Sequence, residues 1–223
     1  MAALPQKVLG VTSFDRPALE QVATATRESV QEIINIAATA EAFAVTILGG
    51  ALANAANGTL ALNAEQIQAI KASRAEEQAH YAYLIGAGAK PLTTTFTVPD
   101  PKIVTEVATF LNTLITLEEI FIAAYIAAAQ EFAILGRPEL AQVVMAIAAV
   151  EAEHRVLARA FAVEGGVIMG LPNNIAFQQA FYASVGEASA ALQQLGFIGG
   201  SGPQITYPGP GAIDNTNVKQ LTP

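Results

Sequence analysis

Apolar residues recur three and four residues apart over most of this chain, the spacing that places side chains on one face of an α-helix. Four long stretches show the pattern, at about residues 17–56, 64–85, 102–134 and 138–162. A fifth, weaker pattern covers about residues 171–195. The remainder is rich in Gly and Pro and is expected to be an irregular tail that moves unless it docks on the domain or on another subunit. The chain is therefore predicted to be all-α.

Start and stop residues place the helix ends. Asp15 and Pro17 are typical of a helix N-terminus, and Asn57-Gly58 is a stop signal. Asn63 can cap the second helix, and Asp100-Pro101 resembles the start of the third. We expect the helical pattern of the first helix to run from this start to about Ala56.

The connections predict how the helices are ordered in space. The short turn Gly136-Arg137-Pro138 implies antiparallel third and fourth helices. Residues 90–101 are too many for a tight helical hairpin but enough to cross the length of a bundle, so the second and third helices can run parallel. The predicted organisation has an N-terminal extension, a four-helix bundle, an additional packed helix and a tail, at residues 1–16, 17–165, 166–195 and 196–223.

Composition excludes several classes of function. Hydrophobic residues make up 52% of the 223 residues and charged residues 13%, which excludes a disordered chain. The net charge of −8 gives no electrostatic footprint for nucleic acid. The chain has no cysteine, so disulfides, thiolate metal sites and thiol catalysis are excluded.

The N-terminus and the apolar stretches bear on location. Met1 to Pro5 lack the basic and apolar regions of a signal peptide, so the chain as written is expected to be cytoplasmic, or exported or periplasmic if it is a processed form. Three apolar stretches have the length of a membrane span, but each carries glutamates in its middle. Carboxylates at mid-bilayer are costly, so we predict no membrane insertion.

Glutamates and histidines interrupt the apolar faces of all four long helices. The chain contains only two histidines, and each follows a glutamate by three residues, at Glu77-x-x-His80 and Glu151-x-x-His154. Residues three apart share a helix face, and both motifs fall on apolar stripes that should face a core. The stripes of the first and third helices carry single carboxylates, Glu41 and Glu118.

Some assignments stay open at this level. Glu119 lies on an alternative apolar stripe of the third helix, so periodicity favours Glu118 only modestly. Glu76 falls off its stripe and is expected either to support a ligand or to lie at the surface. Glu153 also lies off the motif face and is expected to reach solvent or to brace a ligand.

Six buried polar residues in one core need a common partner, because an unpaired buried charge is costly. The candidate metal ligands are Glu41, Glu77, His80, Glu118, Glu151 and His154. Two divalent metal ions would balance the charge of the four carboxylates. Carboxylate and imidazole ligands suit Fe(II), Mn(II) or Zn(II). Among these metals we expect Fe first, Mn second and Zn third. No other cofactor is predicted, and no catalytic residue is assigned.

The order of these residues is repeated along the chain. Glu41 precedes Glu77-x-x-His80 by 36 residues, and Glu118 precedes Glu151-x-x-His154 by 33. Residues 75–80 align with residues 149–154. Two helix pairs with the same ligand order can face each other about a pseudo-twofold axis, which predicts a site with two equivalent halves.

The chain resembles the ferritin-like superfamily and, more narrowly, bacterial ferritin-like domains related to desiccation-related proteins. The resemblance covers about residues 18–165 and is carried by AEEQAH at 75–80, LEEIFIAAY at 117–125 and VEAEH at 150–154. It implies a dinuclear Fe or Mn centre with one carboxylate from each of two helices and Glu-x-x-His from each of the other two. It also favours Glu118 over Glu119.

The resemblance further implies reaction with O₂ or peroxide, as in ferroxidase, peroxidase or catalase-like chemistry with a role in oxidative stress. Three tyrosines lie near the predicted ligands: Tyr81, Tyr83 and Tyr125. Aromatic residues in a core more often pack against neighbours than take part in redox chemistry. The alternative function is a structural or stress-protective protein in which the metal only staples the helices. The fifth helix and the tail suit a homo-oligomer, whereas an iron-storage cage has weak support.

Overall fold

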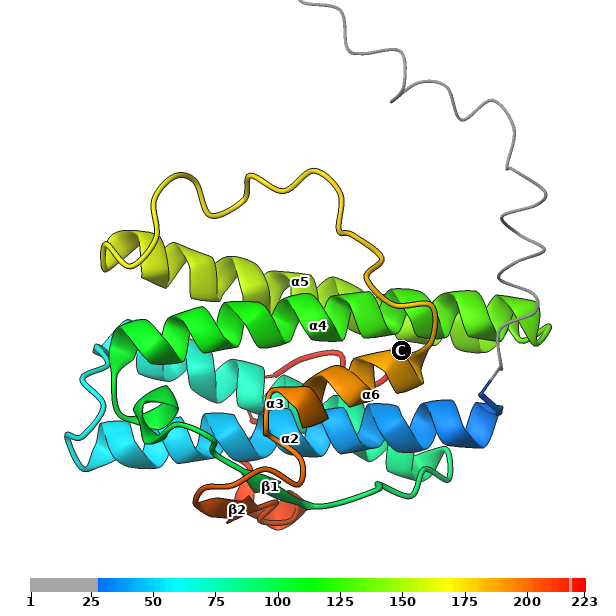
Figure 1. Cartoon of the computed structure of the whole chain (residues 1–223), viewed down its shortest axis with the longest axis horizontal. Helices are drawn as coiled ribbons and strands as arrows, with labels where there is room; N and C mark the ends of the chain where they lie inside the picture. The colour runs from blue at the N-terminus through cyan, green and yellow to red at the C-terminus, as the bar shows by residue number, and fades with distance from the viewer. Residues whose placement is uncertain (1–27, 217) are drawn as a thin grey trace, which may run out of the picture.

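Four long helices run side by side in the computed structural model, which describes residues 28–216 and 218–223 (Figure 1). They are α2 (Val30–Ala56), α3 (Ala64–Gly86), α4 (Val107–Ile134) and α5 (Pro138–Glu164). Each pair that is consecutive in the chain, α2 with α3 and α4 with α5, packs closely as an antiparallel hairpin. Gly136, with a φ of +71°, makes the turn between α4 and α5. The predicted all-α bundle is confirmed.

The first helix begins later than predicted. Ser29 caps α2 through a capping box, in which its hydroxyl accepts from the Glu32 N–H and the Glu32 carboxylate accepts from the Ser29 N–H at 2.7 Å. This side-chain pair satisfies backbone donors that would otherwise be unpaired at a helix start. Glu28 and Ser29 are not helical, so the helix expected from about residue 17 is wrong at this point. The predicted start at Asp15 and Pro17 lies outside the described residues.

The connection between α3 and α4 runs back along the bundle, so these two helices are parallel, as expected (Figure 1). It contains strand β1 (Thr95–Thr97) and the 3₁₀ helix η2 (Pro101–Val104). Asp100 caps η2 rather than a long α-helix, and α4 begins only at Val107. The Asn54 side chain donates to the Val104 carbonyl at 2.8 Å, which fastens η2 to α2.

The C-terminal helix is shorter than the sequence pattern predicts. Helix α6 (Val185–Gln194) buries Val185 and Leu192, whereas Phe177, expected on the same helix, is 83% exposed and irregular. Two side chains from other elements bind the start of α6: Glu131 accepts from the Val185 N–H at 3.0 Å and Glu28 from the Gly186 N–H at 3.1 Å. A local cap, in which the Ser184 hydroxyl accepts from the Glu187 N–H, and these tertiary contacts therefore fix the start of this helix together.

The Gly- and Pro-rich tail docks on the domain. Strand β2 (Gln204–Thr206) pairs antiparallel with β1, with Ile205 opposite Phe96, and η3 (Pro210–Ala212) follows. Phe96 and Phe197 pack against Phe43 of α2, with ring centroids 5.3 and 4.9 Å away. The crossover and the tail thus cover α2 together.

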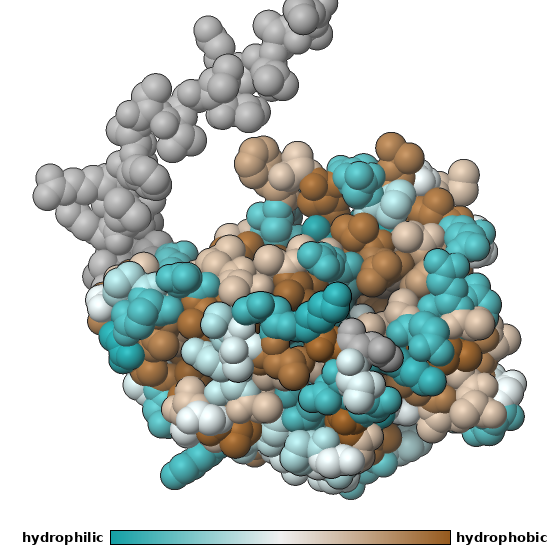
Figure 2. All heavy atoms as spheres, turned by 180° about the vertical axis from the view of Figure 1, so that it is seen from behind, coloured by the Kyte–Doolittle hydropathy of each residue, from teal (hydrophilic) through white to brown (hydrophobic). Residues whose placement is uncertain are grey.

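Two apolar clusters fill the bundle and meet at its middle. One contains Ile33 and Phe132, and the other contains Phe43 and Leu111. On α2, Glu41 lies between the residues of the first cluster and those of the second. On the outside, hydrophobic and hydrophilic residues are interspersed over the face seen from behind (Figure 2). On α2, a buried carboxylate therefore marks the change from one apolar cluster to the other.

Two of the described helices, α2 and α4, are long and apolar enough to cross a membrane by length and composition. The core helix of a soluble bundle meets the same criterion. Both helices carry a glutamate, Glu41 or Glu118, that is buried in the bundle. The absence of membrane insertion stays a prediction.

Candidate metal centre

The six residues singled out by the sequence lie together in the middle of the bundle. Glu41 comes from α2, Glu118 from α4, and each Glu-x-x-His pair comes from one turn of α3 or α5. They form two groups of four whose potential ligand atoms lie within 4.8 Å of one another. The groups are Glu41, Glu77, His80 and Glu151, and Glu77, Glu118, Glu151 and His154. Glu77 and Glu151 belong to both groups, and both are fully buried.

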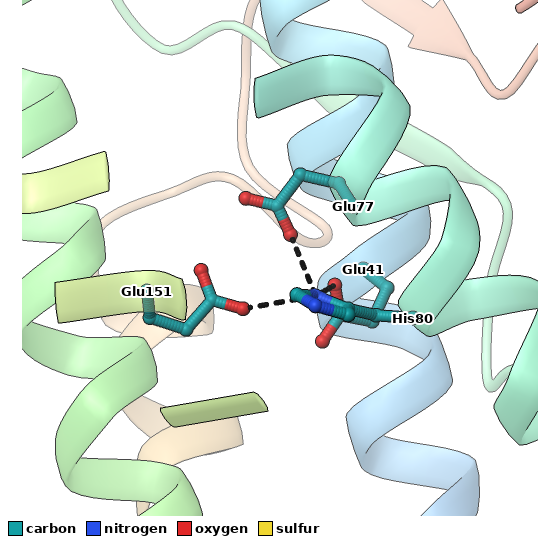
Figure 3. A group of neighbouring side chains, drawn as sticks. All are labelled: Glu41, Glu77, His80 and Glu151. Atoms are coloured by element: carbon teal, nitrogen blue, oxygen red, sulfur yellow. Dashed lines mark ion pairs between the residues drawn. The ribbon is translucent and has the colours of Figure 1, made fainter. Parts of the chain in front are cut away.

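The two shared carboxylates each present one oxygen to each imidazole. Glu151 places Oε1 3.2 Å from His80 Nδ1 and Oε2 3.2 Å from His154 Nδ1. Glu77 places Oε2 3.7 Å from His80 Nδ1 and Oε1 3.1 Å from His154 Nδ1. Figure 3 shows the carboxylates of Glu77 and Glu151 converging on His80 from two helices, with Glu41 beside the ring. Glu41 Oε2 lies 3.5 Å from His80 Nδ1.

Two further residues bind the outer atoms of this cluster. The Tyr125 hydroxyl donates to Glu41 Oε1, a contact between α4 and α2 that the sequence pattern does not reveal. Glu76 Oε2 lies 2.7 Å from His154 Nε2 and therefore supports a candidate ligand on another helix, one of its two expected roles. A carboxylate on the outer imidazole nitrogen fixes which ring nitrogen carries the proton and so orients the other toward a metal.

The remaining candidates lie outside the cluster. Glu119 is partly buried and belongs to neither group of four, whereas Glu118 is buried within one of them. Glu153 is exposed. Tyr81 packs on Tyr207 of the tail, with ring centroids 4.7 Å apart, and Tyr83 lines a cavity beside His80.

Several buried atoms of the cluster lack a hydrogen-bonding partner among the described residues. They are Glu41 Oε2, both carboxylate oxygens of Glu77, His80 Nδ1, Glu118 Oε2 and Glu151 Oε1. A buried acceptor without a donor costs about 1–3 kcal/mol, and more when it is charged. Divalent cations between these atoms would satisfy all of them, so the residues fit a metal centre.

Burial and mutual contact shift the pKa values of these groups. Burial raises the pKa of Glu41 and that of Glu118 well above the usual range. Burial alone would lower the pKa values of His80 and His154, but the surrounding carboxylates raise both well above normal. Burial likewise opposes ionisation of Glu77, yet contacts with His154 and His80 lower its pKa. Without a metal, protons on the imidazoles and on Glu41 and Glu118 would balance the buried charge.

A cavity of about 220 Å³ adjoins the cluster at His80, and a much smaller one of about 20 Å³ adjoins it at Glu118 and His154. His80 and Tyr83 line the larger cavity from α3, Val150 from α5, and Lys219 and Pro223 from the C-terminal segment. The His80 side chain is 13% exposed, whereas that of His154 is 2% exposed. The candidate centre is therefore accessible from the His80 side.

A four-helix bundle with four core carboxylates and a Glu-x-x-His pair on each of two helices defines the ferritin-like class of proteins. A family model for the ferritin-like domain matches residues 32–164, more than half of the chain, and the chain belongs to this family. No curated protein and no solved structure matches it. The narrower likeness to desiccation-related proteins stays an expectation.

Proposed function

We propose that the chain binds two divalent metal ions, with Glu41, Glu77, His80, Glu118, Glu151 and His154 as ligands. The observation that supports this proposal best is the geometry of Glu77 and Glu151. Each directs one oxygen toward each imidazole and belongs to both groups of potential ligands. Carboxylates in that position suit bridging between two ions.

Charge balance supports two ions rather than one. Four carboxylates are almost completely buried, and a low-dielectric core tolerates such a cluster only when its net charge is close to zero. Two divalent ions would neutralise the four carboxylates and replace the protons of the metal-free cluster. Oxygen and imidazole nitrogen ligands suit Fe, Mn or Zn. Because the chain belongs to the ferritin-like family, we propose Fe first, Mn second and Zn third.

We further propose that the centre reacts with O₂ or peroxide. A pair of Fe or Mn ions would supply the electrons for reducing such an oxidant. The chain would position the ions: Tyr125 holds Glu41, and Glu76 holds His154. The cavity beside His80 is large enough for a small oxidant, whereas the one beside His154 has a volume of only about 20 Å³.

Metal analysis tests the ligand set. Wild-type protein is expected to hold roughly two Fe or Mn ions per chain by elemental analysis. Glu151→Gln keeps the side-chain volume but removes the charge of a shared carboxylate. It should reduce the metal content to less than about one ion per chain. Glu153→Gln is the matched control, because Glu153 is exposed and two residues away on the same helix. Equal metal content in both variants would contradict the proposed ligands.

A structural metal site is the second candidate function. It is supported by the origin of the ligands, one or two from each of the four bundle helices, so that bound ions would hold all four helices together. Loaded protein is then expected to melt higher than metal-free protein, with no consumption of Fe(II), O₂ or peroxide. Turnover of any of these would exclude a purely structural role, and an unchanged melting temperature would exclude the staple.

A further inference from the structure

A second cavity, of about 710 Å³, lies between α2, α3 and the C-terminal segment. Its lining includes Gly49, Lys71, Arg74, Ile213 and Asp214, and none of the six proposed metal ligands. Its volume is within the range of small-molecule sites, roughly 300–1,000 Å³. The cavity is therefore a candidate site separate from the metal centre.

Arg74 is held in a fixed position at this cavity. Its Nε donates to the Val45 carbonyl of α2 at 3.0 Å. Its guanidinium lies against the backbone at Gly49, where a Cβ atom would come within 2.7 Å of Nη2. Gly49 thus leaves the space that the guanidinium occupies. A planar, pre-positioned guanidinium can bind a carboxylate or a phosphate through two parallel hydrogen bonds.

The charges at the cavity favour an anion. Lys71 lies one turn before Arg74 on α3, and neither comes within ion-pair distance of a carboxylate among the described residues. The one acidic residue in the lining, Asp214, already accepts from the Thr216 N–H at 3.0 Å and the Thr216 hydroxyl at 2.8 Å. Two cations and one engaged carboxylate leave the pocket net positive in a chain whose net charge is −8.

We propose that this cavity binds a small anionic molecule through a phosphate or carboxylate group held by Arg74 and Lys71. The guanidinium supplies directed N–H donors, and the ammonium of Lys71 adds a second positive charge. Ile213 and Leu52 offer apolar surface to the uncharged part of the ligand. The C-terminal segment forms one wall, so the site depends on the docked tail.

Binding of two probes by the full-length chain tests the proposal. Inorganic phosphate and citrate are titrated separately by isothermal calorimetry, which distinguishes a phosphate site from a carboxylate site. Arg74→Gln and Lys71→Gln are each expected to weaken binding of the preferred probe about tenfold, the effect of losing one charge-assisted contact. Lys102→Gln is the control, because Lys102 is an exposed cation paired with Glu106 and lies away from the cavity.

Two neighbouring glycines provide a test that removes no charge. Gly49→Ala should displace the guanidinium of Arg74 and weaken binding several-fold. Gly50→Ala should leave the affinity unchanged, because a Cβ atom there meets only Val104 Cγ1 at 3.8 Å. Both changes replace glycine by alanine inside the same helix, where alanine is favoured, so neither should prevent folding.

The metal centre gives an independent control. Glu151→Gln should keep the affinity for the preferred probe, and Arg74→Gln should keep the metal content of the wild type. Loss of anion binding in Glu151→Gln would show that the probe binds the metals and would overturn the proposal. Absence of saturable binding of both probes, or equal affinity in wild type and Arg74→Gln, would also overturn it.

Discussion

The two halves of the candidate metal centre have the same ligand order but different surroundings. His154 Nε2 contacts Glu76 of α3. In the internal repeat the position that matches Glu76 is Val150, and Val150 lines the cavity beside His80. Among the described residues, no carboxylate therefore takes the matching place at His80, whose side chain is 13% exposed, whereas that of His154 is 2% exposed.

The carboxylates of Glu41 and Glu118 also differ in their contacts. Glu41 accepts a hydrogen bond from Tyr125, which follows Glu118 by seven residues. The residue that follows Glu41 by seven is Leu48, which lies beside Glu118 and has no hydroxyl to donate. One half thus has a carboxylate that accepts from a tyrosine and a histidine that borders the larger cavity. In the other half, among the described residues, the histidine contacts a carboxylate and the single carboxylate has no tyrosine donor. The internal repeat therefore keeps the same residue types at the candidate ligand positions but not the same contacts to those residues.

Among the changes that separate the two halves, removing Glu41 or Glu118 singly should give the largest effect. Glu41→Gln and Glu118→Gln each remove one negative charge from one half, so each variant should hold roughly one metal per chain instead of two. Elemental analysis measures the content, and stepwise metal titration shows whether one binding phase is lost. Either variant that keeps both metals would show that its carboxylate is not a ligand.

Exchanging the supports of the two histidines should give a smaller effect. Glu76→Gln removes the charge from the carboxylate that contacts His154 and should weaken metal binding roughly 10- to 100-fold, the usual effect of changing a group that orients a ligand. Val150→Glu, at the matching position beside His80, should strengthen binding in that half.

Competition with a chelator measures both changes. Glu139→Gln serves as the control, since Glu139 is exposed and pairs with Arg137 at the surface. Equal metal affinity in wild type and Glu76→Gln would contradict the proposal that Glu76 supports His154.

Loss of the tyrosine hydroxyl should give a still smaller effect. Tyr125→Phe leaves Glu41 without its donor and should lower the free energy of unfolding of the loaded protein by about 1–2 kcal/mol. Tyr83→Phe is the matched control, because Tyr83 lines the neighbouring cavity and makes no described hydrogen bond to the cluster. Chemical denaturation compares the two, and identical stabilities would argue that the hydroxyl contributes nothing to this half.

Removing the carboxyl of Glu131, which lies outside the centre, should give the smallest effect. This change tests whether groups outside the metal centre contribute to the pH dependence of stability. Burial raises the pKa of Glu131 to about 7. Between the ordinary pKa of a glutamate and this value, the folded chain keeps a proton that the unfolded chain has lost. The resulting stabilisation is complete at lower pH and is lost as the pH rises through about 7.

The wild type is therefore expected to lose about 1 kcal/mol over this pH interval relative to Glu131→Gln, an amount reduced for solvent screening. Thermal unfolding of both proteins at several pH values measures the difference. A difference that does not change with pH would contradict a raised pKa for Glu131. A wild type that gains stability relative to Glu131→Gln as the pH rises would contradict it as well.

Much of the architecture follows from local information. The three-four spacing predicts α3 and α5 to within two residues at each end, because helix faces and caps are local properties. Asn63 caps α3 as expected. The same spacing places six polar residues on inward faces, and the structure brings all six together.

Other features depend on contacts that no local pattern contains. The periodicity of residues 171–183 resembles a helix, but Phe177 finds no apolar surface and the helix begins only at Val185. Ser184 caps this helix locally, but side chains distant in sequence, Glu28 and Glu131, bind the N–H groups of Gly186 and Val185. The tail likewise is ordered by pairing with β1, a partner more than a hundred residues away.

The sequence by itself determined the four long helices, their order and the six candidate ligands on their inward faces, because periodicity and the spacing of Glu and His act within one or two turns. Only the tertiary structure decided how the halves differ. Tyr125 reaches Glu41, and Glu76 reaches His154, across the bundle. Such contacts depend on how helices pack against one another, and a single helix cannot specify them.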